Sequence, residues 1–242
     1  MHAGVSRHPP LDSATATFSE APWAESFVAA MRQAPRPVKI ISPCVGINAP
    51  ERAAREMEMP WESCGDYEIN RSLGPTLCYL AQDISKVHVG PRTGNIIDVQ
   101  VADLDLAADG LVSGPPCPPF SDFGRRLVEV DPRTSVFFTV ARWILHLAEF
   151  GSLSFWIIEN VCGIRKRRSG EQSFGDWFIA EMKSAMPHGW EVTFLEHNSI
   201  DCCVPQSRPR VFFIGTSGSL RTSPRQRRIL SAPLMVRPHV DI

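Results

Sequence analysis

The sequence predicts an α/β fold with an open, mostly parallel sheet and helices on both faces. Short apolar runs recur along the chain, and each ends in a turn or loop signal. The segments between them include stretches rich in helix formers, or with apolar residues at spacings of three and four. Nearly continuous apolar strands that alternate with helices are typical of a parallel sheet covered on both faces.

The order of these elements follows from the same pattern. We expect strands at residues 38–42, 109–114, 154–160, 190–196 and 210–215. We expect helices at residues 49–58, 133–150 and 173–186, with Thr134 or Ser135 as a cap near the start of the second. Residues 1–36 are rich in Ala, Ser, Pro and Thr, which predicts an irregular leader with one helix near residues 24–32.

Size and composition bound the class of protein. The chain has 242 residues, enough to bury a core in one domain or in one domain plus appendages. We see neither an apolar run near the roughly 20 residues of a membrane span nor the apolar core of a secretory signal. Seven cysteines without a CxxC pair argue against a disulfide framework and against a metal site. A reducing compartment, the cytosol or the nucleus, fits best.

Basic residues are unevenly spread, although the formal net charge is −1. Residues 204–240 contain seven arginines and no acidic residue, and a second basic cluster, RKRR, spans residues 165–168. Such runs are typical of a solvated face or tail, or of contact with a polyanion, and the sequence leaves both open. We expect residues 217–242 to form a basic C-terminal tail.

A cysteine between two proline pairs follows the second expected strand. In GPPCPPFS, Cys117 lies between Pro116 and Pro118, and a further proline flanks each of them. Prolines restrict φ, so the loop is stiff and holds the thiol in place with little further loss of entropy. Ligands of open α/β sheets bind at the carboxyl ends of strands, where this thiol lies. From the loop alone, Cys117 is equally well a nucleophile or a buried structural cysteine.

Two more strand ends carry polar side chains. Glu159 and Asn160 follow four apolar residues, and a partly desolvated Glu can share or donate a proton near neutral pH. The alternative is an acid that caps the next helix.

Gln206, Arg208 and Arg210 are spaced by two before the last strand, so they share one face if that segment is extended. Two guanidinium groups on one face suit a phosphate or a base edge, although surface arginines on a sheet edge are common.

In this order and on this fold, the three motifs resemble those of the cytosine-5 methyltransferase family. The resemblance rests on GPPCPPFS, on ENV at residues 159–161, on NSIDCCVPQSRPR, and on the stretch at residues 94–117 that leads to the cysteine. It covers about residues 38–215. It implies a Rossmann-like S-adenosylmethionine-dependent methyltransferase fold at residues 37–216, with S-adenosyl-L-methionine as cofactor and DNA as partner.

The resemblance implies four catalytic residues: Cys117, Glu159, Arg208 and Arg210. Cys117 would attack C6 of a cytosine ring, and Glu159 would relieve the charge that develops at N3. The two arginines would hold the base carbonyl or a nearby phosphate, while Asn160 would order the loops of the site. The target base would first have to leave the stack of its helix.

The resemblance also implies six cofactor-binding residues: Cys44, Gly46, Asn48, Glu68, Asn95 and Pro116. The glycine-rich loop of the family resembles ISPCVGINAPERAA, where Asn48 replaces a glycine and Cys44 replaces an aromatic residue. Asn tolerates positive φ best among the other residues, so the turn can survive. Glu68 would bind the ribose, with Asp66 as a competitor. Asn95 replaces an Asp that usually contacts the adenine.

The resemblance stops short of the family's last motifs. After VFFIG the family continues into a target-recognition region and two further motifs, but 27 residues follow here. We therefore expect a fragment, a degenerate copy, or a partner chain that completes the cleft. Three functions stay open: a DNA cytosine-5 methyltransferase, a tRNA methyltransferase of the same chemistry, or a non-catalytic nucleic-acid-binding relative. We expect a nuclear or cytoplasmic protein, with the nucleus favoured.

Overall fold

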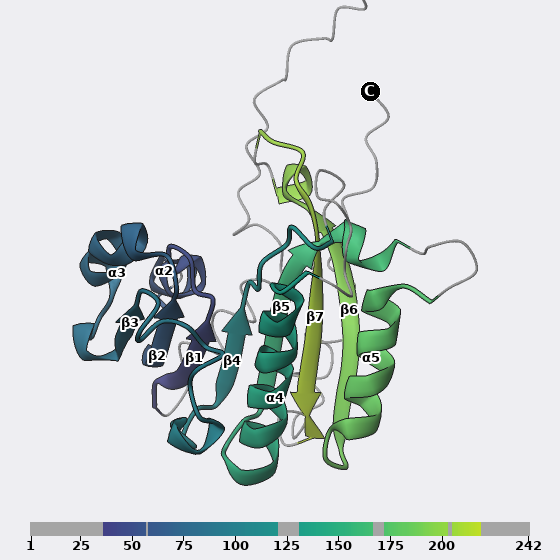
Figure 1. Ribbon diagram of the computed structural model, residues 1–242, viewed down its shortest axis with the longest axis horizontal. Coiled ribbons are helices and arrows are strands. Elements are labelled where there is room, and N and C mark those ends of the chain that lie inside the picture. Colours follow the sequence, from purple (N-terminus) through teal and green to yellow (C-terminus); the bar gives the residue numbers. More distant parts are fainter. Residues whose placement is uncertain (1–35, 57, 121–130, 167–171, 203–204, 219–242) are drawn as a thin grey trace, which may run out of the picture.

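A seven-stranded sheet lies at the centre of the computed structural model, which describes residues 36–56, 58–120, 131–166, 172–202 and 205–218. The strands are β1 (Val38–Pro43), β2 (Trp61–Glu68), β3 (Val87–Val89), β4 (Gly110–Ser113), β5 (Phe155–Val161), β6 (Trp190–Asn198) and β7 (Pro209–Ser217). They are ordered β3-β2-β1-β4-β5-β7-β6 (Figure 1). The pairings are parallel except those of β7, which is antiparallel to both neighbours.

The strand order reverses between β1 and β4. From β1 the chain builds outward to β3, and it then returns to add β4 and β5 on the other side of β1. Ligands of open α/β sheets bind at such a reversal, next to the carboxyl ends of the strands. Cys44 follows β1 and Gly114 follows β4, while Glu159 lies near the end of β5. The loop after β1, the loop that carries Cys117 and the ENV motif therefore meet at the carboxyl edge of the parallel strands.

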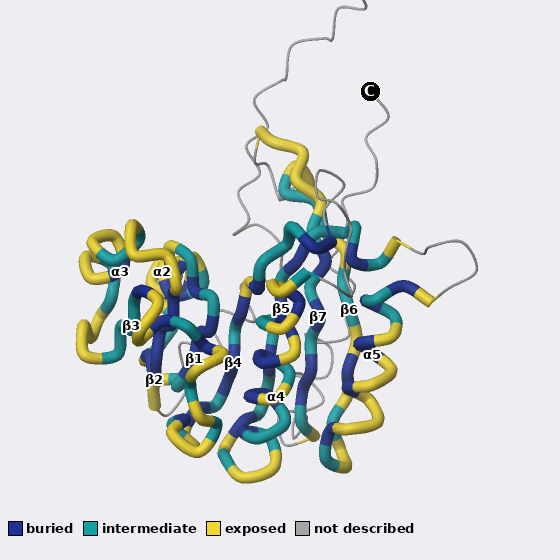
Figure 2. The backbone as a smooth tube through the Cα atoms, viewed as in Figure 1, coloured by how far each residue is buried: buried dark blue, intermediate teal, exposed yellow. Residues whose placement is uncertain are grey.

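Two helices cover one face of the sheet through a cluster of aromatic rings. These are α4 (Thr134–Phe150) and α5 (Phe174–Ala185). The ring of Phe137 on α4 lies 4.7 Å from that of Phe178 on α5, and Phe178 lies 5.5 Å from Phe213 on β7. All three side chains are at most 2% exposed and belong to the main core. Figure 2 shows buried positions along the central strands and on α4 and α5.

The other face carries α2 (Ala49–Glu56), and α3 (Gly74–Leu80) lies beyond it near β3. Successive residues of a strand point to opposite faces. Tyr67 of β2 contacts Trp143 of α4 with ring centroids 5.0 Å apart. Its neighbour Asp66 instead accepts a hydrogen bond from Asn48, directly before α2. The helices therefore lie on both faces, and the predicted fold class is confirmed.

Helix α4 buries the residues that the periodic pattern selects. Its residues at 1% exposure or less are Phe137, Val140, Trp143, Ile144 and Leu147. The predicted cap is wrong: the N-cap is Arg133, whose side chain makes no capping bond, and Thr134 and Ser135 lie within the first turn. Asp131 instead accepts the backbone N–H of Arg133 at 2.9 Å and so orders the approach to the helix.

Several expectations fall outside the described residues. They are the leader at residues 1–35, with its helix near residues 24–32, and the tail from residue 219. Within the part of the chain that is described, no helix is both long enough and apolar enough to cross a membrane.

Candidate active site

An ion pair joins two of the predicted catalytic side chains. In the antiparallel pair of β5 and β7, Glu159 lies opposite Phe212 and Arg210 lies opposite Val161, so Glu159 and Arg210 are diagonal neighbours on one face. Nε of Arg210 lies 2.6 Å from Oε1 of Glu159, and the side chains are 21% and 36% exposed, respectively. The pair is held in place but is open to a ligand.

The second oxygen of Glu159 faces the loop that carries Cys117. A Cβ built on Gly114 would lie 3.6 Å from Oε2 of Glu159 and 3.9 Å from the carbonyl oxygen of Cys44. The backbone after β4 therefore runs beside both the acid and the loop after β1. Glu159 is an acid on the face of a sheet, paired with a guanidinium, and its described contacts are not those of a helix cap.

Asn160 fixes the proline loop to the end of β5. Its side chain is 1% exposed, and Nδ2 donates to the carbonyl of Pro115 at 3.2 Å. Its Oδ1 accepts the backbone N–H of Val161 at 2.9 Å. Because a buried amide with both ends bonded is costly to displace, the stiff loop is also anchored.

Cys117 is a half-buried free thiol in a turn of this loop. Its carbonyl accepts the backbone N–H of Phe120 at 2.9 Å. Hydrogen bonds to Asp131, and more weakly a thiolate at Cys117, raise the pKa of Arg133. The guanidinium of Arg133 itself is paired with Asp131 at 2.6 Å. Pro116 lies half-buried beside the thiol.

The other predicted arginines are not gathered with Glu159. Arg208 is exposed one residue before β7, and its backbone N–H donates to Oδ1 of Asn198 at 2.7 Å. Arg165 of the RKRR cluster lies 2.6 Å from Glu196 and 3.2 Å from Asp176. Arg165 is therefore paired with two acids within the fold, while residues 167 and 168 of the RKRR cluster lie outside the described residues.

The loop after β1 has the backbone of a ligand-binding turn. Cys44, Gly46 and Asn48 have φ values of 57°, 60° and 55°, so the turn expected from Asn48 is present. Oε2 of Glu68 accepts the N–H of Gly46 at 3.0 Å, and Oε1 accepts that of Asn70 at 2.8 Å. A Cβ on Gly46 would meet no atom within 4 Å. The residues therefore leave room for a cofactor beside a carboxylate, and they fit the one that the resemblance implies.

Two cofactor-binding candidates depart from the family. Burial, and then the charge of Glu68, raise the pKa of the Cys44 thiol to about 12, so this thiol is neutral at physiological pH. Asn95 donates through Nδ2 to Oδ2 of Asp98 at 2.6 Å. The amide of Asn95 is therefore paired with a carboxylate three residues further along the chain.

A buried polar cluster under α2 was also missed. Nδ2 of Asn48 donates to Oε2 of Glu51 at 2.5 Å and to Oδ2 of Asp66 at 3.1 Å, and all three residues are 2% exposed. Asp66 therefore binds the side chain of Asn48, whereas Glu68 binds the backbone of Gly46. Burial, and then the charge of Glu51, raise the pKa of Asp66 to about 7.

Replacing Asp66 with Asn should stabilise the protein above neutral pH. Because the pKa is raised in the folded state, folding retains a proton between about pH 4 and pH 7, and the contribution of Asp66 to the unfolding free energy falls across that window. At pH 8 we expect D66N to be more stable by roughly 2–4 kcal/mol, at about 1.4 kcal/mol per pKa unit. Urea denaturation at pH 5 and pH 8 measures the difference.

The matched control is Asp83→Asn, because this exposed acid has a lowered pKa from hydrogen bonds with Ser85. D83N should not gain stability at pH 8. Equal pH dependence of D66N and the parent protein would show that Asp66 is ionised in the folded state throughout.

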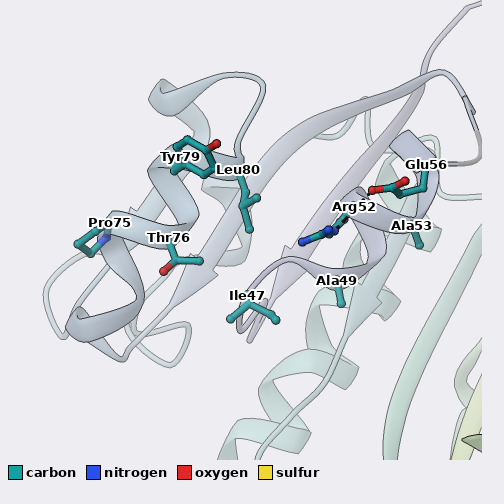
Figure 3. Close-up of a pocket in the computed structure, with 9 residues that line it drawn as sticks. All are labelled: Ile47, Ala49, Arg52, Ala53, Glu56, Pro75, Thr76, Tyr79 and Leu80. Atoms are coloured by element: carbon teal, nitrogen blue, oxygen red, sulfur yellow. Dashed lines mark ion pairs between the residues drawn. The ribbon is translucent and has the colours of Figure 1, made fainter. Parts of the chain in front are cut away.

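A groove of about 730 Å³ separates α2 from α3. Figure 3 shows Ile47 and Ala49, from the loop and the start of α2, on one side and Pro75 and Thr76 of α3 on the other. The groove lies behind the loop, and neither Cys117 nor Glu159 lines it. The side chains of the loop therefore differ in exposure: Ile47 faces the groove, whereas Asn48 is buried.

Comparisons with known proteins point to one family. A family model for C-5 cytosine-specific DNA methylases matches residues 61–236. The Type II methyltransferase M.DdeI of Desulfomicrobium norvegicum is 33% identical over 162 residues, which are 67% of this chain and 34% of that protein. M.NlaIV of Neisseria lactamica is 31% identical over 59% of this chain and 29% of its own length. The chain thus spans about a third of these curated relatives.

Solved structures share the fold at lower identity. The Dnmt2 methyltransferase of S. pombe superposes with a TM-score of 0.57 at 17% identity, over 75% of this chain and 51% of its own. A DNMT2 mutant from Spodoptera frugiperda gives a TM-score of 0.57 at 22% identity, over 77% of this chain and 51% of that one. At these identities the likeness concerns the fold alone.

Proposed function

The chain belongs to the C-5 cytosine-specific DNA methylase family, and from this premise we propose that it methylates C5 of cytosine in DNA through a transient bond to Cys117. The observation that carries the proposal is the Glu159–Arg210 pair, whose free carboxylate oxygen faces the loop of the cysteine. A nucleophile, a proton-holding acid and a cation at one sheet edge are the groups that this reaction needs.

The residues divide the reaction among them. The sulfur of Cys117 adds to C6 of an unstacked cytosine and the proton of its thiol passes to N3, where the N3–H donates a hydrogen bond to the carboxylate Oε2 of Glu159. Carbon C5 thereby becomes nucleophilic. After C5 has gained its methyl group, a base removes the C5 proton, the bond between Cys117 and C6 breaks, and N3 gives up its proton. Arg210 keeps Glu159 in place through Oε1.

S-adenosyl-L-methionine supplies the methyl group as an electrophile when it is bound. The residues that would hold it are Cys44, Gly46, Asn48, Glu68, Asn95 and Pro116. The left-handed turn at Gly46 and the nearby carboxylate of Glu68 support this role, because they leave an open space beside polar backbone groups. We propose that residues 37–216 form the catalytic domain, and that a partner chain or further sequence supplies the second wall of the cleft.

The proposed substrate is DNA, which the family description and the relatives' name as Type II methyltransferases support. The basic tail at residues 217–242 suits contact with its phosphates. A nuclear location follows from this substrate and stays a prediction.

A trapping experiment tests the function. The full chain is incubated with S-adenosyl-L-methionine and a duplex that carries 5-fluorocytosine, whose fluorine cannot be removed from C5 as a proton is. We expect a covalent complex, mapped by mass spectrometry to the peptide that contains Cys117. A complex formed with fluorocytosine tRNA instead of DNA would move the substrate to tRNA. No complex, together with no cofactor binding, would make the chain a non-catalytic relative.

Replacing Glu159 with Gln should slow formation of this complex by roughly 100-fold, because the group that holds the N3 proton is lost. R210Q should act through the same step, so the double variant should be little slower than E159Q. The rate of complex formation in single-turnover conditions measures both. The control is Arg142→Gln on the exposed side of α4. Additive effects of E159Q and R210Q would contradict a shared role.

A further inference from the structure

The turn before α2 is built around one asparagine side chain. Asn48 has a φ of 55° and is 2% exposed. Its backbone N–H donates to the carbonyl of Val45 at 3.0 Å, and its own carbonyl accepts the N–H of Arg52 at 3.1 Å. Asn48 therefore closes the turn on one side and begins the helix on the other. A glycine could adopt the same φ, so the conformation alone does not require this side chain.

The amide of Asn48 links three elements of the fold. Its two N–H bonds point to Glu51 on α2 and to Asp66 on β2, at 2.5 Å and 3.1 Å. A glycine would leave both carboxyl groups without this donor. Its Oδ1 and the buried hydroxyl of Ser42 have no partner among the described residues. The cluster thus has unused acceptors, and its stability depends on how many protons it holds.

Few charged groups face this cluster. From α2, Arg55 lies 2.9 Å from Oε1 of Glu51 and also donates to the carbonyl of Leu80 at 2.6 Å. From β2, the uncharged hydroxyl of Ser63 faces Asp66. When Glu51 and Asp66 are both ionised, two negative charges share one amide, and Arg55 reaches only the outer oxygen of Glu51. Protonation of Asp66, whose pKa burial and then the charge of Glu51 raise, removes one of these two charges.

The same turn carries the proposed cofactor contact. Gly46, two residues before Asn48, donates its backbone N–H to Glu68 at 3.0 Å. A Cβ on Gly46 would meet no atom within 4 Å, so there is room for the cofactor beside this residue. Only Ile47, which faces the groove in Figure 3, separates the two. A shift of Asn48 therefore moves the backbone of Gly46, because the intervening chain is a single residue of a tight turn.

We infer that Asn48 is a positioning residue for the cofactor loop: its amide ties the turn to the buried carboxyl groups of Glu51 and Asp66, and ionisation of Asp66 beside Glu51 loosens the turn and weakens cofactor binding. The identity of the ligand in this inference rests on the proposed function. The hydrogen bonds from Asn48 to Glu51 and Asp66 are a property of the free protein, so their effect on the turn is measured without a ligand.

The test uses the full chain in two measurements at pH 6 and pH 8.5. Hydrogen exchange follows the backbone amides of residues 44–52 without ligand, with protection corrected for the intrinsic pH dependence of exchange. Calorimetry measures the Kd of S-adenosylhomocysteine, the demethylated cofactor. For the parent protein we expect protection to fall, and Kd to rise, by about 10-fold between the two pH values, a typical size for coupling between sites.

Three variants separate the side chain from the backbone. D66N should keep high protection and low Kd at both pH values, because the neutral amide mimics the protonated acid. N48G keeps the backbone freedom but loses the tie, so it should show low protection and weak binding at both. Asp83→Asn, at an exposed turn, should keep the pH response of the parent protein. Glu51→Gln replaces D66N if that variant does not fold.

The outcomes distinguish the tie from the function. Parent-like pH response in D66N and E51Q, or parent-like protection in N48G, would overturn the inference. If protection responds as expected but S-adenosylhomocysteine does not bind at either pH, the tie stands and the proposed function fails.

Discussion

Replacing Cys117 with Ser is expected to abolish the covalent complex with fluorocytosine DNA and to lower methyl transfer by at least roughly 10⁴-fold, the size seen when a nucleophile is removed. A hydroxyl occupies the same place but is a far weaker nucleophile near neutral pH than a thiol, of which a small fraction is already thiolate. The two residues on either side of Cys117 are prolines, which carry no nucleophilic group.

The nearby thiols do not offer a substitute. Burial, and then the charge of Glu68, keep Cys44 protonated, with a pKa of about 12. Burial, and then Glu196, also raise the pKa of Cys162. The matched control is Cys78→Ser, because Cys78 is exposed on α3. Denaturing gels and mass spectrometry of the complex measure the result. A complex that persists in C117S at the rate of C78S would place the nucleophile elsewhere.

The sequence predicted the strands that are rich in apolar residues and missed two that are not. Strand β2 reads WESCGDYE, yet Ser63, Asp66 and Glu68 are at most 9% exposed. Asp66 and Glu68 are buried because the turn after β1 supplies their partners, Asn48 and Gly46. Hydrophobic periodicity does not contain such tertiary contacts. Strand β3 spans three residues and pairs with β2 alone, so its pattern is too short to detect.

The hydrophobic pattern also does not predict the direction of a strand. An apolar run such as RVFFIG predicts a strand but does not say which way it runs. The antiparallel setting of β7 turns Arg210 toward Glu159, because it makes the two diagonal neighbours across β5 and β7. The motifs identified Glu159 and Arg210, but the ion pair between them could be predicted only with knowledge of the register of β5 and β7. Arg208, two positions earlier, falls before the strand, so equal spacing in sequence did not give equal placement.

Replacing Gly94 with Ala should destabilise the protein by more than about 4 kcal/mol, at the far end of what single substitutions do. A Cβ at this position would lie 2.1 Å from the carbonyl oxygen of Glu68 and 2.7 Å from that of His88. Both are backbone atoms at the ends of neighbouring strands. The Glu68 carbonyl already accepts the N–H of Gly90 at 2.8 Å, and Gly94 donates to Gly90 at 2.7 Å. The contact therefore cannot be relieved by turning a side chain.

The Gly94→Ala substitution should also disturb the candidate active site, because a shift of the Glu68 backbone moves the carboxylate that holds the loop at Gly46. Gly114→Ala is the matched control: its Cβ would lie at ordinary contact distance, 3.6 Å from Glu159 and 3.9 Å from Cys44. We expect G114A to change the unfolding free energy by less than about 1 kcal/mol. Urea denaturation of both variants at one pH compares them. Equal midpoints would mean that Gly94 does not lie against the end of β2, and that the proposed cofactor carboxylate is not held from this side.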